Sequence, residues 1–249
     1  NIIGTDLKKG QIAEYAWRHQ DKFKQYEPLS EALSQLREVF LYRHKLVQQR
    51  TSMCVRKQSK TKSEPSKAMS FINRKSEHLI AEMDAAIKEC DDMIDKIIKE
   101  DEELRENYEI VTSIKGVARQ NGVCLLIFTS NSKRFDMDAR KIACYYGVAP
   151  FVKTSGTSVH SPARTSHFAN KLIKSLLSQA AQIAKIFNPE IKSYYDRLIR
   201  RGKNHSVALN NVKNKLLRII VSLVKNKTKY DPNKYVLCKN RLDQKFVTI

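Results

Sequence analysis

The sequence predicts a mainly α-helical protein built from more than one part. Its 249 residues are 41% hydrophobic, enough for a packed core, and apolar residues recur every three or four positions over long stretches. Seven glycines and six prolines are too few for a sandwich of many short strands joined by tight turns. Because single hydrophobic cores rarely grow beyond about 250 residues, we expect two units joined by an elongated connecting segment.

Three helices are expected in the first half of the chain. Residues 11–26 fit a short amphipathic helix that ends before a Glu-Pro pair. Leucines at three- and four-residue spacing predict a long helix over 29–54, and the polar, Ser-rich segment 55–68 suits a hairpin tip or a loop. A second long helix is expected over 69–107.

The second long helix carries the spacing of a coiled-coil seam. Its seam positions are Ile80, Met83, Ile87, Cys90, Ile94, Ile97, Asp101 and Leu104, of which Asp101 alone is charged. Two such helices form an antiparallel hairpin with little core of its own, which favours pairing with another chain. A compact bundle that contains the same helices is an open alternative. The acids Asp91, Asp92 and Asp95 are interpreted as a solvated face.

Shorter elements are expected after residue 108. A glycine within 113–118 suits either the phosphate-binding turn of a helix-hairpin-helix unit or a plain loop. Residues 138–146 predict a short helix that ends at Gly147. The Ser- and Thr-rich segment 153–167 is interpreted as a polar loop. Further helices are expected over 168–187, 190–201 and 205–225.

The net charge of +20 lies wholly in the second half of the chain. Residues 1–110 carry 20 Lys and Arg and 20 Asp and Glu, whereas residues 111–249 carry 26 basic residues against six acids. A field of this sign attracts polyanions and gains affinity through release of counterions from phosphates. The second half is therefore predicted to bind nucleic acid, with a merely basic surface as the alternative.

The other totals exclude several classes of protein. Five widely spaced cysteines without a CxxC pair argue against a disulfide framework and predict a reduced, cytoplasmic protein. No apolar stretch reaches the length of a membrane helix, so no membrane partner is expected. Zincin, P-loop and dinucleotide motifs are absent from the sequence. Acids are so scarce after residue 110 that a two-metal site built wholly there is hard to assemble.

Ser155 and Gly156 lie in the polar segment, in a basic setting. A hydroxyl that attacks a phosphodiester needs exposure, a flexible backbone and nearby cations, and Lys153, Arg164, Lys171 and Lys174 are close in sequence. A Ser-Gly pair in a polar segment is more often only a turn, and the residues alone favour that interpretation.

Five motifs follow one another in the second half of the chain: KIACYYGVAPF (141–151), TSGTSV (154–159), RTSHFANKLIKSLL (164–177), YYDRLIRRGK (194–203) and ALNNVKNKLLRII (208–220). In this order they resemble the C-terminal domain of transposases of the insertion-sequence 110/116/902 family. A looser extension takes in SIKGVA (113–118) and TDLKKG (5–10). The match runs over some 110 residues in order, which makes chance similarity a poor explanation.

The resemblance implies a domain order and a mechanism. Residues 1–27 would be the end of a RuvC-like acidic domain, 28–108 a coiled-coil hairpin, 109–232 the C-terminal transposase domain and 233–249 a tail. Ser155 of the Ser-Gly motif would be the nucleophile for DNA strand cleavage and exchange. It would act with a Mg²⁺-binding acidic cluster of a partner subunit in a homo-oligomer, and a bridge RNA would select the DNA. The protein would lie in the bacterial cytoplasm, associated with the nucleoid.

The sequence departs from the family pattern in the acidic motif. Thr5 and Asp6 match it, but Lys9 stands where the fourth acid is expected, which leaves Asp6 as the one candidate metal ligand. One carboxylate cannot hold Mg²⁺ in the geometry that phosphoryl chemistry requires. These departures favour a truncated, partly degenerate copy with an incomplete metal site.

Two functions are therefore carried forward. In the first, Ser155 is the nucleophile and Arg164, Lys171, Lys174 and Lys203 contact phosphates or stabilise the transition state. In the second, the chain is a noncatalytic, oligomeric nucleic-acid-binding protein. A purely structural coiled-coil protein is a third alternative, which the charge of the second half disfavours.

Overall fold

The computed structural model describes residues 9–20, 28–58, 66–131, 133–155, 159–165 and 169–232, and the protein is mainly α-helical as predicted. The chain divides into two compact units, residues 1–30 and 31–249. In order, the described elements are α1 (Lys9–Arg18), α2 (Glu31–Gln58), α3 (Lys67–Glu100), α4 (Glu102–Thr112), α5 (Arg119–Phe128), α6 (Ala139–Tyr145), β1 (Pro150–Ser155), β2 (Val159–Thr165), α7 (Lys171–Phe187), α8 (Pro189–Arg200) and α9 (His205–Lys225).

The first unit contributes one described helix, α1. It begins and ends earlier than the predicted span of 11–26, and residues 21–27 lie outside the described part. Arg18 bonds Glu14 one turn before it, at 2.6 Å. The apolar residues Ile12, Tyr15 and Trp17 are all exposed, so α1 buries no apolar stripe within its own unit.

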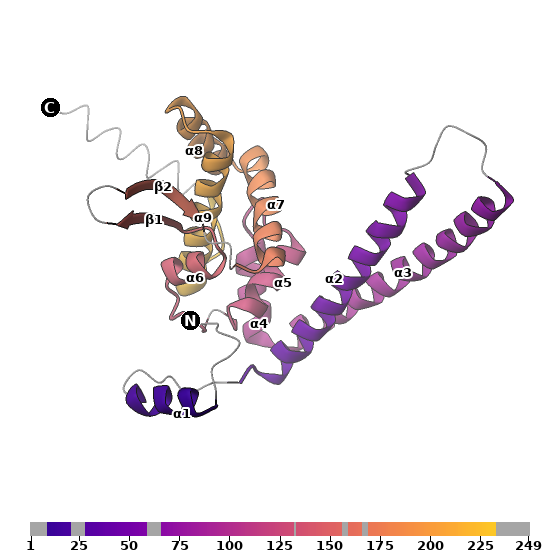
Figure 1. Cartoon of the computed structure of the whole chain (residues 1–249), viewed down its shortest axis with the longest axis horizontal. Helices are drawn as coiled ribbons and strands as arrows, with labels where there is room; N and C mark the ends of the chain where they lie inside the picture. The colour runs from indigo at the N-terminus through magenta and orange to yellow at the C-terminus, as the bar shows by residue number, and fades with distance from the viewer. Residues whose placement is uncertain are drawn as a thin grey trace. The chain divides into compact units, whose positions relative to one another are not determined.

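Helices α2 and α3 form the predicted antiparallel hairpin and lie side by side (Figure 1). Arg43 of α2 pairs with Asp91 of α3, and Arg50, two turns further along α2, pairs with Asp84, two turns earlier on α3. The buried residues of the α2–α3 hairpin gather towards its open end and include Leu33, Leu36, Phe40, Ile94 and Ile97. Towards the tip the apolar side chains of Val55, Phe71 and Ile72 are about half exposed.

The prediction of one continuous helix over 69–107 is wrong at Asp101. α3 ends at Glu100, Asp101 takes an extended backbone, and α4 begins at Glu102. The Asp101 carboxylate accepts a hydrogen bond from the Leu104 backbone N–H at 2.9 Å, which is an N-cap. Asp101, the one charged residue of the predicted seam, therefore marks the start of a new helix. Its carboxylate pairs with a backbone N–H that the first turn of α4 leaves without a partner.

Replacing Asp101 with alanine is expected to destabilise the protein by about 1 kcal/mol, because α4 loses its N-cap. Chemical denaturation would measure the change. Asp101→Asn is the control, since an asparagine oxygen can accept the same hydrogen bond and should restore most of the stability. Equal losses in both variants would contradict the capping role.

The acid Asp91 does not lie on a solvated face. Its carboxylate accepts two hydrogen bonds from Arg43, at 2.7 and 2.9 Å, and one from Gln120 of α5 at 3.0 Å. Arg119 of α5 lies 3.7 Å from Asp91 and pairs with Asp95 at 2.9 Å. The side chains of Asp91 and Arg43 are only 19% and 18% exposed. Side chains of α2, α3 and α5 thus meet at one polar junction.

Helix α9 lies at the centre of the helices that follow the hairpin. It packs against α4, α6, α7 and α8, and its inward residues include Ala208, Val212, Leu216, Leu217, Ile220 and Val224. α7 turns Ile173, Leu177 and Ala181 into the same core. The three predicted helices of this region are confirmed, with starts at Lys171, Pro189 and His205.

The turn at 113–118 packs closely against α7. Gly116 has φ +109°, and a Cβ placed there would lie 2.6 Å from the Ala184 backbone. An L side chain fits neither this backbone conformation nor this space. Gly116 therefore allows the α4–α5 turn to approach α7.

The prediction of a polar loop over 153–167 is wrong for most of its residues. β1 and β2 pair antiparallel, from Pro150 opposite Thr165 at the base to Ser155 opposite Val159 at the other end (Figure 1). The register shifts between Phe151 and Lys153, so β2 accommodates one extra residue around Pro162. A bulge tolerates proline, which has no N–H to donate, and this explains why a Pro- and Ser-containing segment still forms a strand.

Two further predictions concern cysteine pairing and membrane helices. The four cysteines within the described part, Cys54, Cys90, Cys124 and Cys144, are unpaired. No helix in that part is long and apolar enough to cross a membrane.

Candidate nucleic-acid interface

Ser155 is the last residue of β1. Its backbone pairs with Val159, at the end of the β1–β2 hairpin remote from Pro150 and Thr165. Lys153 pairs with Ser161 on the same hairpin, and Gly156 and Asp6 lie outside the described residues. The predicted nucleophile therefore sits on a two-stranded ribbon rather than in an irregular loop.

The base of the hairpin is tied to α9 by two asparagines. Asn210 and Asn214 each donate a side-chain N–H to the Val148 carbonyl, both at 2.9 Å. Val148 follows Gly147, which ends α6 with φ +63° as predicted, and its own N–H bonds to the Ala143 carbonyl. A carbonyl with two donors is fully satisfied, so the chain enters β1 at a defined place.

Lys174 lies at the base of the hairpin. Its Nζ is 3.4 Å from the hydroxyl of Thr165, which pairs with Pro150 at the start of β1. At about 3.3 Å per strand residue, the five steps from Pro150 to Ser155 span roughly 17 Å. Lys174 and Ser155 are thus at opposite ends of the hairpin.

Lys213 of α9 is a basic residue that sequence reasoning missed. Its side chain is half-buried, and desolvation, followed by the charge of Lys174, lowers its pKa. The signal that could have found it is its spacing, since Asn210, Lys213 and Asn214 share one face of a helix. Nothing in the linear sequence shows which element that face meets.

The remaining predicted contacts are spread over the domain. Arg164 pairs with Phe151 near the base of the hairpin and is exposed, and Lys171 is the exposed first residue of α7. Lys203 is exposed in the turn between α8 and α9. The structure thus brings Arg164 and Lys174 to the same hairpin, while Lys203 belongs to a different turn of the domain.

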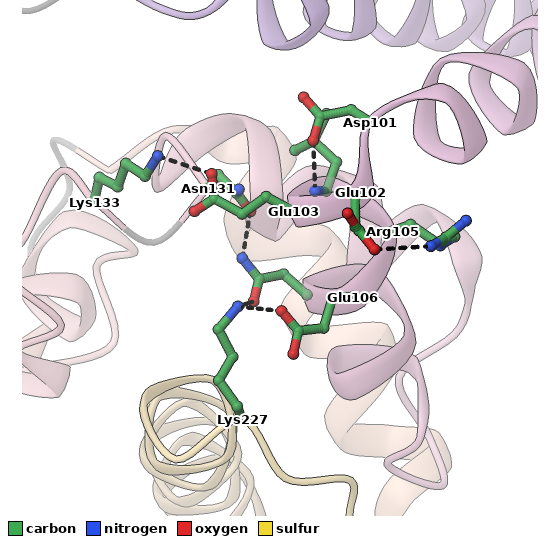
Figure 2. A network of polar contacts seen from close by, with 10 residues as sticks. Asp101, Glu102, Glu103, Arg105, Glu106, Asn131, Lys133 and Lys227 are labelled. Atoms are coloured by element: carbon green, nitrogen blue, oxygen red, sulfur yellow. Dashed lines mark hydrogen bonds and ion pairs between the residues drawn. The ribbon is translucent and has the colours of Figure 1, made fainter.

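Several cations of the basic half are neutralised within the chain. Three lysines pair with glutamates of α4: Lys133 with Glu103, Lys227 with Glu106 and Lys229 with Glu109, at 2.9, 2.6 and 2.8 Å. Figure 2 shows the first two pairs, and Lys227 also donates to the buried Asn107 at 3.0 Å. These lysines bind the acidic helix and are poor candidates for phosphate contacts.

Other cations form no ion pair with a described carboxylate. They include the exposed Lys171, Lys192, Arg200, Arg201 and Lys203, on α7, α8 and the α8–α9 turn, and the half-buried Lys213 on α9. Tyr194 of α8 adds an aromatic surface, with Arg197 5.4 Å and Lys215 4.8 Å from its ring centre. Exposed unpaired cations are what a phosphate backbone requires, so these helices form the candidate interface.

The described residues do not fit a Mg²⁺ site. They contain no cluster of three or more His, Cys, Asp or Glu side chains able to hold a metal ion. Of the acids described in the basic half, Glu190 pairs with Lys215 at 2.8 Å and Asp136 with Lys141 at 2.8 Å, while Asp138 caps α6. Carboxylates in these roles are not assembled around a common point.

Comparisons with known proteins identify a similar family. Residues 108–196, from the middle of α4 into α8, match the model of the transposase IS116/IS110/IS902 family. The insertion element IS110 uncharacterized 43.6 kDa protein of Streptomyces coelicolor is 29% identical over 122 residues, which cover 49% of this chain and 30% of that protein. The pilin gene-inverting proteins of Moraxella bovis and Moraxella lacunata are each 24% identical over 147 residues, which cover 59% of this chain and 45% of theirs.

The chain spans less than half the length of these curated relatives. The matched segment contains α5, α6, the β1–β2 hairpin and α7, and therefore both Ser155 and Lys174. Through residues 108–196 the chain is similar to transposases of the IS116/IS110/IS902 family, in agreement with the family that its sequence motifs resemble.

Proposed function

We propose that this chain is the serine-bearing part of a DNA transposase or recombinase, with Ser155 as the nucleophile. The observation that carries the proposal is the family match over 108–196, which includes the hairpin that ends β1 at Ser155. The relatives' names support it, since they describe an insertion-element protein and gene-inverting proteins. Unpaired cations on α7, α8 and α9 suit a DNA substrate.

The proposed reaction is a pair of transesterifications. The Ser155 oxygen attacks a backbone phosphorus, its proton is released, and an O–P bond forms while the bond from phosphorus to one nucleoside oxygen breaks. The departing oxygen takes up a proton and becomes a free hydroxyl. A hydroxyl of another strand then attacks the phosphoserine and restores Ser155, so no external energy source is needed. Nearby cations would stabilise the charge that develops on the phosphoryl oxygens.

Further parts of the proposal rest on the family resemblance. They are a bridge RNA that selects the DNA, a homo-oligomer that pairs through the α2–α3 hairpin, and Mg²⁺ bound with the help of Asp6. The exposed apolar residues Val55, Phe71 and Ile72 near the hairpin tip are compatible with a second copy there. No step of the proposed reaction is assigned to Mg²⁺, because the described residues do not assemble a site for it.

Covalent capture tests the role of Ser155. The full-length protein is incubated with its RNA, Mg²⁺ and DNA that carries an end of the element, and protein–DNA adducts are resolved on denaturing gels. We expect an adduct with the wild type and none with Ser155→Ala, because the attacking oxygen is gone. Ser161→Ala, on the neighbouring strand of the same hairpin, is the control and should keep the adduct. An adduct that persists in Ser155→Ala would exclude this residue as the nucleophile.

The second candidate is a noncatalytic, oligomeric nucleic-acid-binding protein. It is favoured by the lack of a metal-binding cluster among the residues described, together with the unpaired cations of the basic half. It predicts steeply salt-dependent binding of DNA or RNA that Ser155→Ala leaves unchanged, with no nicking at any Mg²⁺ concentration. The transposase proposal predicts that the wild type and Ser155→Ala bind DNA equally, but that only the wild type nicks it.

A further inference from the structure

Two lysines from packed helices lie near the base of the β1–β2 hairpin. Lys174 lies in the first turn of α7 and reaches the Thr165 hydroxyl at 3.4 Å. Lys213 lies on α9, which packs against α7. Desolvation lowers the pKa of Lys213, and the charge of Lys174 lowers it further. The two lysines therefore lie on packed helices, within reach of each other's charge, and the side chain of Lys213 is half-buried.

Both lysines face the same short stretch of chain. On α9, Lys213 lies between Asn210 and Asn214, whose side chains bond to the Val148 carbonyl just before β1. On α7, Lys174 contacts Thr165, whose backbone is paired with Pro150. The base of the β1–β2 hairpin therefore lies beside the Thr165 hydroxyl and beside helices α7 and α9, which each carry one of the two lysines.

No described carboxylate compensates this pair of charges. Lys215, only two residues beyond Lys213 on α9, shows the usual solution: it pairs with Glu190 at 2.8 Å, with both side chains largely buried. Lys213 and Lys174 form no ion pair with any acid in the described ranges. Two cations within reach of each other's charge repel, and a bound anion would relieve that repulsion.

We propose that Lys174 and Lys213, with the Thr165 hydroxyl, form a phosphate-binding site that holds one phosphate of a nucleic-acid backbone at the base of the hairpin. A phosphodiester carries a negative charge and several acceptor oxygens, and it can accept hydrogen bonds from both ammonium groups and the hydroxyl together. The inference rests on the proposed function for the choice of nucleic acid as the polyanion. Held there, a strand could run along the hairpin towards Ser155, roughly 17 Å away.

Salt-dependent binding is the first test. The full chain, carrying Ser155→Ala in every sample so that no covalent product forms, is titrated with a fluorescent DNA duplex over a range of NaCl concentrations. We expect Lys213→Gln to weaken binding about tenfold at about 0.1 M salt, and to reduce the slope of log K against log salt by about one. Lys225→Gln, which removes an exposed, unpaired charge from the far end of α9, is the matched control and should change both values less. Equal effects of the two substitutions would overturn the proposal.

Thermal stability separates a binding role from a structural one. Lys213→Met keeps the aliphatic stem and removes a repelled, half-buried charge, so the melting temperature of the protein without nucleic acid should stay equal or rise. Affinity should fall as it does in Lys213→Gln. A lower melting temperature together with lower affinity would show that Lys213 supports the fold rather than the ligand, and would contradict the proposal.

Lysine acylation identifies the ligand independently of catalysis. Brief acylation followed by mass spectrometry should show that a DNA oligonucleotide protects Lys174 and Lys213 but not Lys225. Protection by inorganic phosphate, without protection by the oligonucleotide, would overturn the assignment to nucleic acid. These readouts need no cleavage, so they can be separated from the test of the nucleophile. If DNA protects the two lysines but the covalent adduct persists in Ser155→Ala, only the proposed nucleophile is contradicted. If the adduct disappears in Ser155→Ala but DNA does not protect the lysines, only the phosphate site is contradicted.

Discussion

Replacing Gly116 with alanine is expected to lower the stability of the second unit by about 4 kcal/mol, or roughly 10 °C in melting temperature. Two effects add in this variant. Alanine is strained at φ +109°, and its Cβ would lie 2.6 Å from the backbone of Ala184, which cannot move without displacing α7. Thermal unfolding followed by circular dichroism would measure the change.

Gly202→Ala is the control for this experiment. Gly202 also has a positive φ, +77°, but open space surrounds the position where its Cβ would lie. That variant should lose only the cost of the backbone strain, about 1 kcal/mol. Similar losses in the two variants would show that the close approach to α7 contributes nothing, and that the turn at Gly116 requires only its backbone conformation.

Replacing Asp91 with alanine is expected to cost about 3 kcal/mol and several degrees of melting temperature. The substitution leaves Arg43, only 18% exposed, without its carboxylate partner, and removes the acceptor for Gln120. Breaking a buried ion pair from one side is costly because the remaining charge stays desolvated. Urea denaturation at fixed salt concentration would give the difference in free energy of unfolding.

Asp84→Ala is the matched control on the same helix. Asp84 pairs with Arg50, an Arg–Asp pair like that of Asp91 and Arg43, but its side chain is 48% exposed and that of Arg50 is 39% exposed. Exposed ion pairs contribute little, so this variant should unfold close to the wild type. If both aspartate variants were equally stable, the polar junction of α2, α3 and α5 would not hold these helices together.

These two positions support the candidate site from a distance. Gly116 packs against α7, the helix that carries Lys174. Asp91 joins the α2–α3 hairpin to α5, which also packs against α7. The variants therefore test whether placement of α7 depends on the first half of the chain. DNA binding measured beside stability would show whether loosening these contacts also weakens the phosphate site.

Helices were the part of the fold that periodicity could predict. Apolar spacing placed α2, α7, α8 and α9 within a few residues of their observed ends, because apolar residues at helical spacing face a neighbouring element. The same rule failed at Asp101, which fits the three-and-four spacing of the seam yet caps a new helix. Spacing alone cannot tell a polar seam residue from an N-cap, because the distinction depends on the local backbone.

The β1–β2 hairpin could not be predicted from composition. Its segment is rich in Ser and Thr and contains a proline, which are turn signals in an isolated stretch. Pairing of the two segments, with a bulge near Pro162, makes strands of them. Strand pairing is a property of two segments together, and neither one alternates clearly enough to reveal the other.

The sequence by itself determined the helical class, the basic second half and the motif that contains Ser155, because these depend on residue order and composition alone. Only the tertiary structure decided that Asp91 lies at a polar junction rather than on a solvated face, and that the helices of Lys174 and Lys213, residues 39 positions apart, both contact the base of the β1–β2 hairpin. The physical reason is that burial and charge neutralisation depend on what the opposite element presents, and that information enters only when α5, α7 and α9 pack.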